Sequence, residues 1–141
     1  HQMDSAISGL SHVDFSCVTS VQNGVRANDQ LSKVFGATNT VGGSAAFSGE
    51  MPASGDVRFT VNSGFEVGEF AGAPTARVQE LSAMLRNSGV NSEAVGNILT
   101  LQWSKFVMWA GATPLGILSR LETYKFASDS GCALVWARVM R

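Results

Sequence analysis

Apolar and polar positions follow two different periods along the chain, one typical of strands and one typical of helices. Both periods occur in the N-terminal part, whereas the C-terminal part has the helical period alone. Residues 15–21 are apolar and rich in β-branched side chains, which is typical of a buried strand in a parallel sheet. A turn signal at residues 22–24 follows, and residues 26–35 then have helical spacing of apolar positions. Strand, tight turn and helix in this order predict half of a βαβ unit.

The middle of the chain carries strand signals. Residues 40–47 are extended in pattern, although they are rich in Gly, Ala and Ser, and residues 50–55 are expected to form a turn. Residues 57–61 and 65–70 alternate between apolar and polar positions on either side of a turn signal at residues 62–64. This pattern predicts a strand followed by an antiparallel β-hairpin that turns at residues 62–64.

Behind the hairpin the spacing becomes helical. The longest helix is expected over residues 97–112. Pro114 cannot continue a regular helix, so we expect a break there and a new helix over residues 114–121. Ser128 or Asp129 is expected to cap a last helix.

These elements predict an α/β fold class, with an α/β domain over residues 1–95 and the start of an all-helical domain over residues 96–141. Hydrophobic residues make up 45% of the chain and charged residues 15%, which favours a folded protein over a disordered one. The net charge of −1 excludes the basic surface expected of a partner of nucleic acid or of an anionic membrane. The apolar stretch over residues 106–118 is too short to cross a bilayer.

The two cysteines, Cys17 and Cys132, form no CxxC pair and no metal-ligand spacing. We therefore expect no metal site, and reduced, packed thiols in a cytoplasmic protein. The sequence begins without methionine, and its last residues read as an unfinished helix. We expect an interior piece of a longer chain.

The most informative cluster is Trp103-Ser104-Lys105, followed eight residues later by Thr113-Pro114-Leu115. Lysine is rare among apolar neighbours, because an isolated buried ammonium is costly. The alternative is a lysine whose stem covers apolar surface while its charged end stays in water. The residue pattern alone favours that second interpretation.

Three segments in order resemble the ketopantoate reductase family. The first is "SVQNGV" over residues 20–25, which is similar to the family's turn after a Rossmann strand. The second is "VGGSAAFSGEMPASGDVRFTVNSGFEVGEF" over residues 41–70, and the third is "LQWSKFVMWAGATPLGIL" over residues 101–118. Each match is weak alone, but their order and spacing together are specific and cover nearly the whole chain.

The resemblance implies NADPH-dependent reduction of a 2-keto acid, of the ketopantoate-to-pantoate type in pantothenate biosynthesis. Residues 1–95 would be the rear part of a Rossmann-like NADP-binding domain, and residues 96–141 the first helices of a substrate and dimerisation domain. In the family the GxGxxG fingerprint comes earlier and part of the substrate site comes later. We therefore expect the 141 residues alone to be inactive.

Carried over by position, the resemblance assigns roles to single residues. Lys105 matches the lysine that donates a proton to the substrate carbonyl oxygen, where negative charge develops during hydride transfer. Its apolar surroundings are expected to lower the lysine pKa, and Trp103 and Trp109 to hold its helix in place. Asn23 matches an asparagine that contacts cofactor and substrate, and Ser48 lies close to a backbone contact to NADPH.

Two positions depart from the family pattern, because Trp109 and Thr113 stand where asparagines are expected beside the substrate. A related reductase of a different keto or hydroxy acid is therefore an alternative, and so is a non-catalytic α/β domain that binds a small ligand or a partner. Thr123 lies near another substrate contact of the family, but a simple turn threonine fits equally well. The apolar face of residues 133–140 can serve a homodimer or belong to the core.

Overall fold

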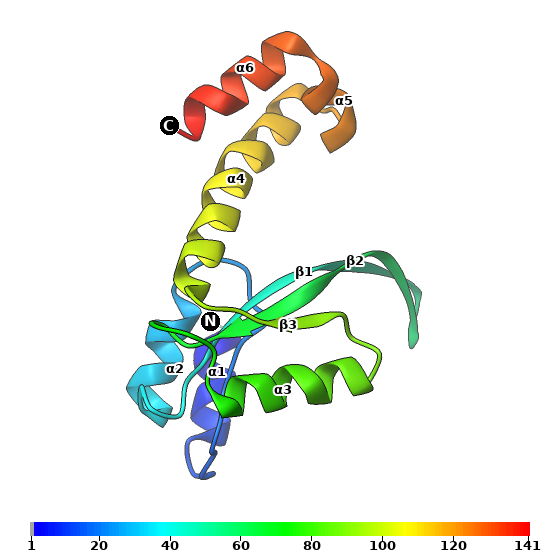
Figure 1. Ribbon diagram of the computed structural model, residues 1–141. Coiled ribbons are helices and arrows are strands. Elements are labelled where there is room, and N and C mark those ends of the chain that lie inside the picture. The colour runs from blue at the N-terminus through cyan, green and yellow to red at the C-terminus, as the bar shows by residue number, and fades with distance from the viewer. Residues whose placement is uncertain (1) are drawn as a thin grey trace. The chain divides into compact units, whose positions relative to one another are not determined.

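The computed structural model describes residues 2–141, which are divided between Gln102 and Trp103 into two compact units (Figure 1). The first unit contains helices α1 (Gln2–Leu10), α2 (Ala27–Phe35) and α3 (Ala76–Asn87) and a three-stranded sheet. The second contains most of α4 (Ile98–Ser119), together with α5 (Thr123–Ser128) and α6 (Ser130–Val139). The predicted α/β class is confirmed.

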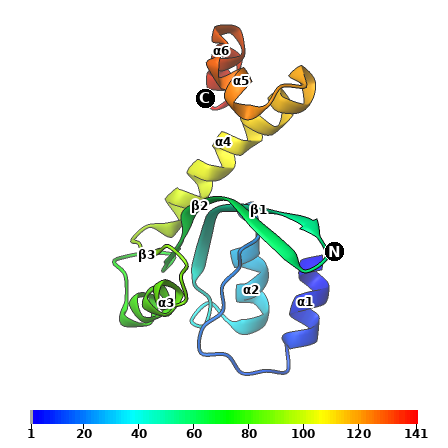
Figure 2. The ribbon, with the colours of Figure 1, turned by 90° about the vertical axis from the view of Figure 1, so that its right-hand side faces the viewer.

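Helices α1 and α2 lie side by side in both ribbon views (Figures 1 and 2). Gln30 Nε2 donates to Asp4 Oδ1 at 3.1 Å, and Ile7 and Leu31 are buried. The segment that precedes α2 pairs at a single parallel bridge, between Val18 and Thr40. The parallel direction agrees with the expected βαβ half, but a strand over the whole of residues 15–21 was wrong, because within that segment Val18 alone makes a bridge.

That antiparallel hairpin is formed by β1 (Gly42–Ala53) and β2 (Asp56–Gly68), with its turn at residues 54–55. The predicted strand over residues 40–47 is confirmed as part of β1, but the hairpin predicted between residues 57–61 and 65–70 was wrong, because both segments lie in β2. There is no turn at residues 62–64, and the turn expected over residues 50–55 is confirmed only at residues 54–55. Gly55 has a φ of 83°, which suits a two-residue hairpin turn. Gly64, with a φ of 153°, lies inside β2 where the register shifts, so this turn signal marks a β-bulge.

A short strand, β3 (Ser92–Ala94), completes the sheet by pairing parallel to β2. The core of this unit is formed by four buried side chains of the sheet region and α3: Val41, Phe65, Val67 and Val78. Arg86 Nη1 donates to Ser82 Oγ at 2.7 Å and to Ser92 O at 2.9 Å, which joins α3 to β3.

Helix α4 runs without a break through Pro114, so the predicted interruption and restart were wrong. A proline removes one backbone hydrogen bond, to the carbonyl of Ala110, and Ala110 is exposed to solvent, where this carbonyl can be hydrated. The cap of the last helix is confirmed, because Cys132 N donates to Asp129 Oδ1 at 2.8 Å. Burial raises the pKa of the Cys132 thiol, and the cap lowers the pKa of Asp129.

Candidate functional site

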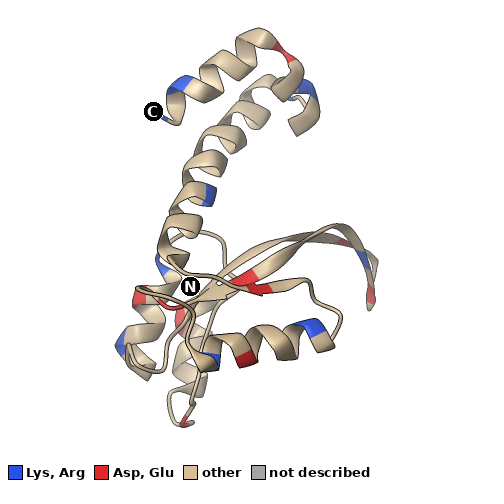
Figure 3. Ribbon diagram, in the orientation of Figure 1, with Lys and Arg blue, Asp and Glu red and all other residues tan. Residues whose placement is uncertain are grey.

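Lys105 is the single charged residue of α4 (Figure 3). The side chain is partly buried, and Trp109 and Thr113 follow it at intervals of four residues along the same stripe of the helix. Trp109 is 45% exposed, and Thr113 is exposed as well. Three of the predicted site residues therefore lie on one face of one helix.

The two tryptophans do not anchor the helix within the described residues. Trp103 is 52% exposed and packs edge-to-face on Phe106, with ring centroids 5.7 Å apart. In the second unit, α4 is instead held by α6, because Trp136 Nε1 donates to Met108 O at 3.0 Å. Gly111 makes this approach possible, since a Cβ there would lie 2.8 Å from Trp136 Cδ1.

The start of α4 packs against two paired glycines of the sheet. Ile98 is fully buried, and Gly42 and Gly68 face each other across the β1–β2 ladder. A Cβ at Gly42 would lie 2.6 Å from Ile98 Cγ2, and one at Gly68 would lie 2.9 Å from Ile98 Cβ. Only glycine lets the helix start come this close to the strands.

A buried amide pair adds polar contacts at the same place. Asn28 Nδ2 donates to Gln102 Oε1 at 2.6 Å, and Gln102 Nε2 donates to Gly43 O at 2.7 Å. Neither amide was predicted from the sequence. A signal existed, since Gln102 follows the buried Ile98 by four residues and therefore lies on the same apolar face.

The Asn23 turn ends the segment that bridges to Thr40. Asn23 is exposed, Gly24 has a φ of 95°, and Gln22 N donates to Ser20 Oγ at 3.1 Å. Just before the turn, Thr19 Oγ1 is buried and has no hydrogen-bond partner among the described residues. Thr19 Oγ1 faces β1, since a Cβ at Gly43 would lie 2.8 Å from it.

The other predicted contacts lie on different elements. Ser48 is exposed on β1, and its hydroxyl is 2.7 Å from Thr60 Oγ1 on the neighbouring strand. The hydroxyl is thus engaged in the hairpin, and Ser48 lies opposite Val61 in the β1–β2 ladder. Thr123 is exposed and begins α5, three residues before the buried Phe126.

A charge pair with two hydrogen bonds joins the residue that follows β2 to the start of α3. Arg77 Nη2 and Nε donate to Glu69 at 2.6 and 2.7 Å, and Thr75 Oγ1 donates to the same carboxylate at 2.6 Å. Hydrogen bonding from Arg77 lowers the pKa of Glu69. Burial raises the pKa of the Cys17 thiol, which packs against the core.

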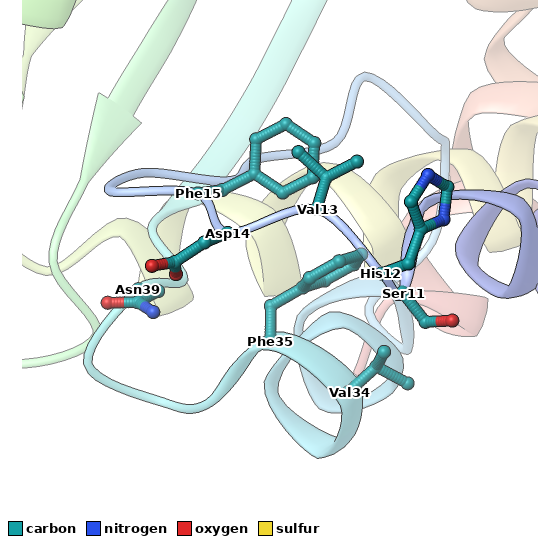
Figure 4. A pocket seen from close by; sticks show the side chains of 8 residues that line it. All are labelled: Ser11, His12, Val13, Asp14, Phe15, Val34, Phe35 and Asn39. Carbon is teal, nitrogen blue, oxygen red and sulfur yellow. The ribbon is translucent and has the colours of Figure 1, made fainter.

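A separate pocket of about 270 Å³ opens beside the end of α2 (Figure 4). The rings of Phe15 and Phe35 pack edge-to-face there, with their centroids 5.6 Å apart, and Asp14 and Asn39 also line the pocket. Within residues 2–141 no cluster of three His, Cys, Asp or Glu side chains could hold a metal ion. In the same range none of the helices combines the length and apolarity needed to cross a membrane.

The chain belongs to the ketopantoate reductase family, whose model, described as ketopantoate reductase PanE/ApbA, matches residues 2–72. The match includes Asn23 and Ser48 and ends before Lys105. A 2-dehydropantoate 2-reductase of Archaeoglobus fulgidus is 28% identical over 113 residues, which is 80% of this chain and 38% of that protein.

Solved structures share the fold over nearly the whole chain. A 2-dehydropantoate 2-reductase from Geobacter metallireducens GS-15 has a TM-score of 0.79 at 23% identity, covering 96% of this chain and 48% of the other. A D-mandelate dehydrogenase, solved as a complex with NADH, has a TM-score of 0.85 at 16% identity, covering 99% of this chain and 47% of the other. The chain thus spans half or less of the length of these relatives.

Proposed function

We propose that the full-length protein reduces a 2-keto acid with NADPH, in the manner of ketopantoate to pantoate, and that Lys105 protonates the carbonyl oxygen. The observation that carries this proposal is the position of Lys105. It is the one charged residue of a long apolar helix, it is partly buried, and the chain belongs to the ketopantoate reductase family.

We assign residues 1–95 to the rear part of the NADP-binding domain and residues 96–141 to the first helices of the substrate and dimerisation domain. The unpartnered Thr19 hydroxyl, the Asn23 amide and the backbone at Ser48 are the groups of this chain that would hold the cofactor. When bound, NADPH supplies the hydride. We expect a cytoplasmic protein, in line with its two free thiols, Cys17 and Cys132.

The chemistry of the lysine follows from its charge. Negative charge grows on the carbonyl oxygen of a keto acid as the carbonyl is reduced, and a positioned ammonium group stabilises that charge. The same group then gives the oxygen its proton. Asn23 orients the substrate through an amide that can both donate and accept hydrogen bonds.

Trp109 and Thr113 favour a second candidate, reduction of a keto or hydroxy acid other than ketopantoate. The indole of Trp109 can donate a hydrogen bond but cannot accept one, so it cannot replace an amide toward a substrate hydroxyl that donates. Its exposed, flat ring instead suits an apolar substrate side chain. NADH is then the alternative cofactor, since it is bound in the D-mandelate dehydrogenase of the same fold.

The test is turnover of the full-length protein with NADPH or NADH and a series of 2-keto acids. Lys105→Ala should lower kcat by on the order of 10² to 10⁴ while cofactor affinity, measured by fluorescence, stays unchanged. Turnover that survives this substitution overturns the proposal, and failure to bind any dinucleotide favours a non-catalytic α/β domain. If the second candidate holds, Trp109→Asn raises kcat/KM for ketopantoate over shorter 2-keto acids, while the control Trp103→Asn does not.

A further inference from the structure

We propose that Asn28 and Gln102 are positioning residues for Lys105. Their buried amide pair fixes the start of α4 on the glycine-rich start of β1 and thereby determines where the helix presents the lysine. The inference rests on the proposed function of Lys105. The two amides position the lysine, and neither of them touches the substrate.

In the Asn28–Gln102 pair, the Gln102 amide uses both its oxygen and its nitrogen in hydrogen bonds. Gln102 accepts from Asn28 at 2.6 Å and donates to the Gly43 carbonyl at 2.7 Å, so donor and acceptor sides of its amide are both used. Asn28 is 6% exposed and Gln102 is 8% exposed. A buried amide that loses a partner cannot turn to water instead, so rotation or sliding of the helix start breaks bonds that nothing replaces.

The pair connects α2, which follows the Asn23 turn, to the start of α4 within the first unit. Asn28 lies in the first turn of α2, five residues after Asn23. Gln102 lies three residues before Lys105 in the same unbroken helix. Because an α-helix is stiff over a single turn, a displacement of Gln102 is carried to Lys105.

Apolar packing at this place cannot do the same task alone. Ile98 lies over Gly42 and Gly68, which holds the helix start close to the strands. Hydrophobic contact has no directional preference, so it sets the distance of approach and leaves rotation about the helix axis weakly determined. Buried hydrogen-bonded groups are known to fix such a register between packed elements.

Proton donation depends steeply on that register. A displacement of about 1 Å at a reacting group can cost on the order of a hundredfold in rate. Loss of the amide pair should therefore lower kcat through Lys105, while the affinity for NADPH, which Gln102 is not expected to touch, stays the same.

A double-mutant cycle in the full-length protein tests this. The four proteins are the unsubstituted one, Gln102→Leu, Lys105→Ala and the combination, and kcat is measured with NADPH and the best 2-keto acid. We expect Gln102→Leu to lower kcat on the order of tenfold to a hundredfold when Lys105 is present. In the Lys105→Ala background we expect Gln102→Leu to change kcat by less than about twofold, because Gln102 then has no lysine to position.

Equal losses in both backgrounds overturn the inference, because they show an effect that does not pass through Lys105. The double variant Asn28→Leu/Gln102→Leu covers the case in which Gln102→Leu fails to fold, since it removes both amides of the pair. We expect this double variant to have the thermal midpoint of the unsubstituted protein and a kcat as low as that of Gln102→Leu. If both its midpoint and its kcat equal those of the unsubstituted protein, the pair has a structural role only. If Lys105→Ala alone leaves turnover unchanged, the proposed function itself fails and the inference falls with it.

Discussion

Glu69 accepts hydrogen bonds from two nitrogens of Arg77 and from the hydroxyl of Thr75. Arg77 also donates to the backbone carbonyl of Thr38. These contacts tie the segment after β2 to the start of α3 and to the loop that leads into β1. The Glu69 side chain is 14% exposed and that of Arg77 is 34% exposed, so water screens the pair only in part.

The pair predicts a pH dependence of stability. Because the pKa of Glu69 in the folded protein is lowered from its ordinary value of 4.5, the ionised carboxylate stabilises the fold above that pH. This contribution is lost as the pH falls through the lowered folded-state pKa. Glu69→Gln should cost about 1 kcal/mol at neutral pH, the discounted value of one charge-assisted hydrogen bond.

Thermal unfolding of the full-length protein from neutral pH to below 4.5 measures this difference. The gap between the two midpoints should close at the acid end. Glu80→Gln, which removes an exposed carboxylate from α3, is the control for the loss of one negative charge. A gap that stays constant into acid contradicts the assignment.

At the level of single residues, the sequence indicated Lys105 through the order of three motifs, and it missed Gln102, Asn28 and Thr19. The reason is physical. A lysine among apolar neighbours is conspicuous in the sequence, whereas a buried amide becomes meaningful only when its partner is known. That partner, Asn28, lies 74 residues from Gln102 in the chain.

The pattern of apolar, polar and turn residues predicted the types of the secondary-structure elements better than their first and last residues. The sequence predicted an antiparallel hairpin, but Asn62-Ser63-Gly64 is a bulge and the turn lies at Ser54-Gly55. Both segments contain the small and polar residues that turns need, and the choice between them depends on the pairing register of β1 and β2. Pro114 was given too much weight, because one lost hydrogen bond does not end a helix of 22 residues.

The crossing of α4 and α6 gives a prediction at the level of elements. Gly111→Ala places a methyl group 2.8 Å from the Trp136 ring, so the ring must shift and weaken its bond to Met108 O. Overpacking of this kind costs about 1–3 kcal/mol, which outweighs the gain of about 1 kcal/mol from helix propensity.

Gly9→Ala is the matched control, since no atom lies within 4 Å of its added methyl group in α1. Urea unfolding of the full-length protein should show a lower midpoint for the Gly111 variant and a higher one for the Gly9 variant. If the urea midpoints of both variants shift in the same direction, the close approach of Trp136 is not the reason why position 111 needs glycine.

On the scale of the whole molecule, the described residues leave large apolar side chains exposed on α6, among them Leu134, Val135 and Val139. Trp136 and Ala133 on the same helix are partly buried and lie on other sides of it. A helix with one covered face and further exposed apolar positions is typical of a helix that packs against a second surface. The two candidates for that surface are a second copy of the protein and further parts of a full-length chain.

Leu134→Glu distinguishes these two uses. If α6 lies in a homodimer, the charge at this 53% exposed position halves the mass measured by light scattering, because a carboxylate in the centre of an interface loses its hydration without gaining a partner. If α6 is covered by the protein's own chain, the mass is unchanged and the unfolding midpoint falls by the same amount at every protein concentration. Ser130→Glu, in the first turn of the same helix, is the control, because an acidic residue there is favoured by the helix dipole. A Leu134→Glu protein that keeps both its mass and its midpoint shows that this face of α6 is solvated in the assembled protein, and it removes the helix from the dimerisation surface.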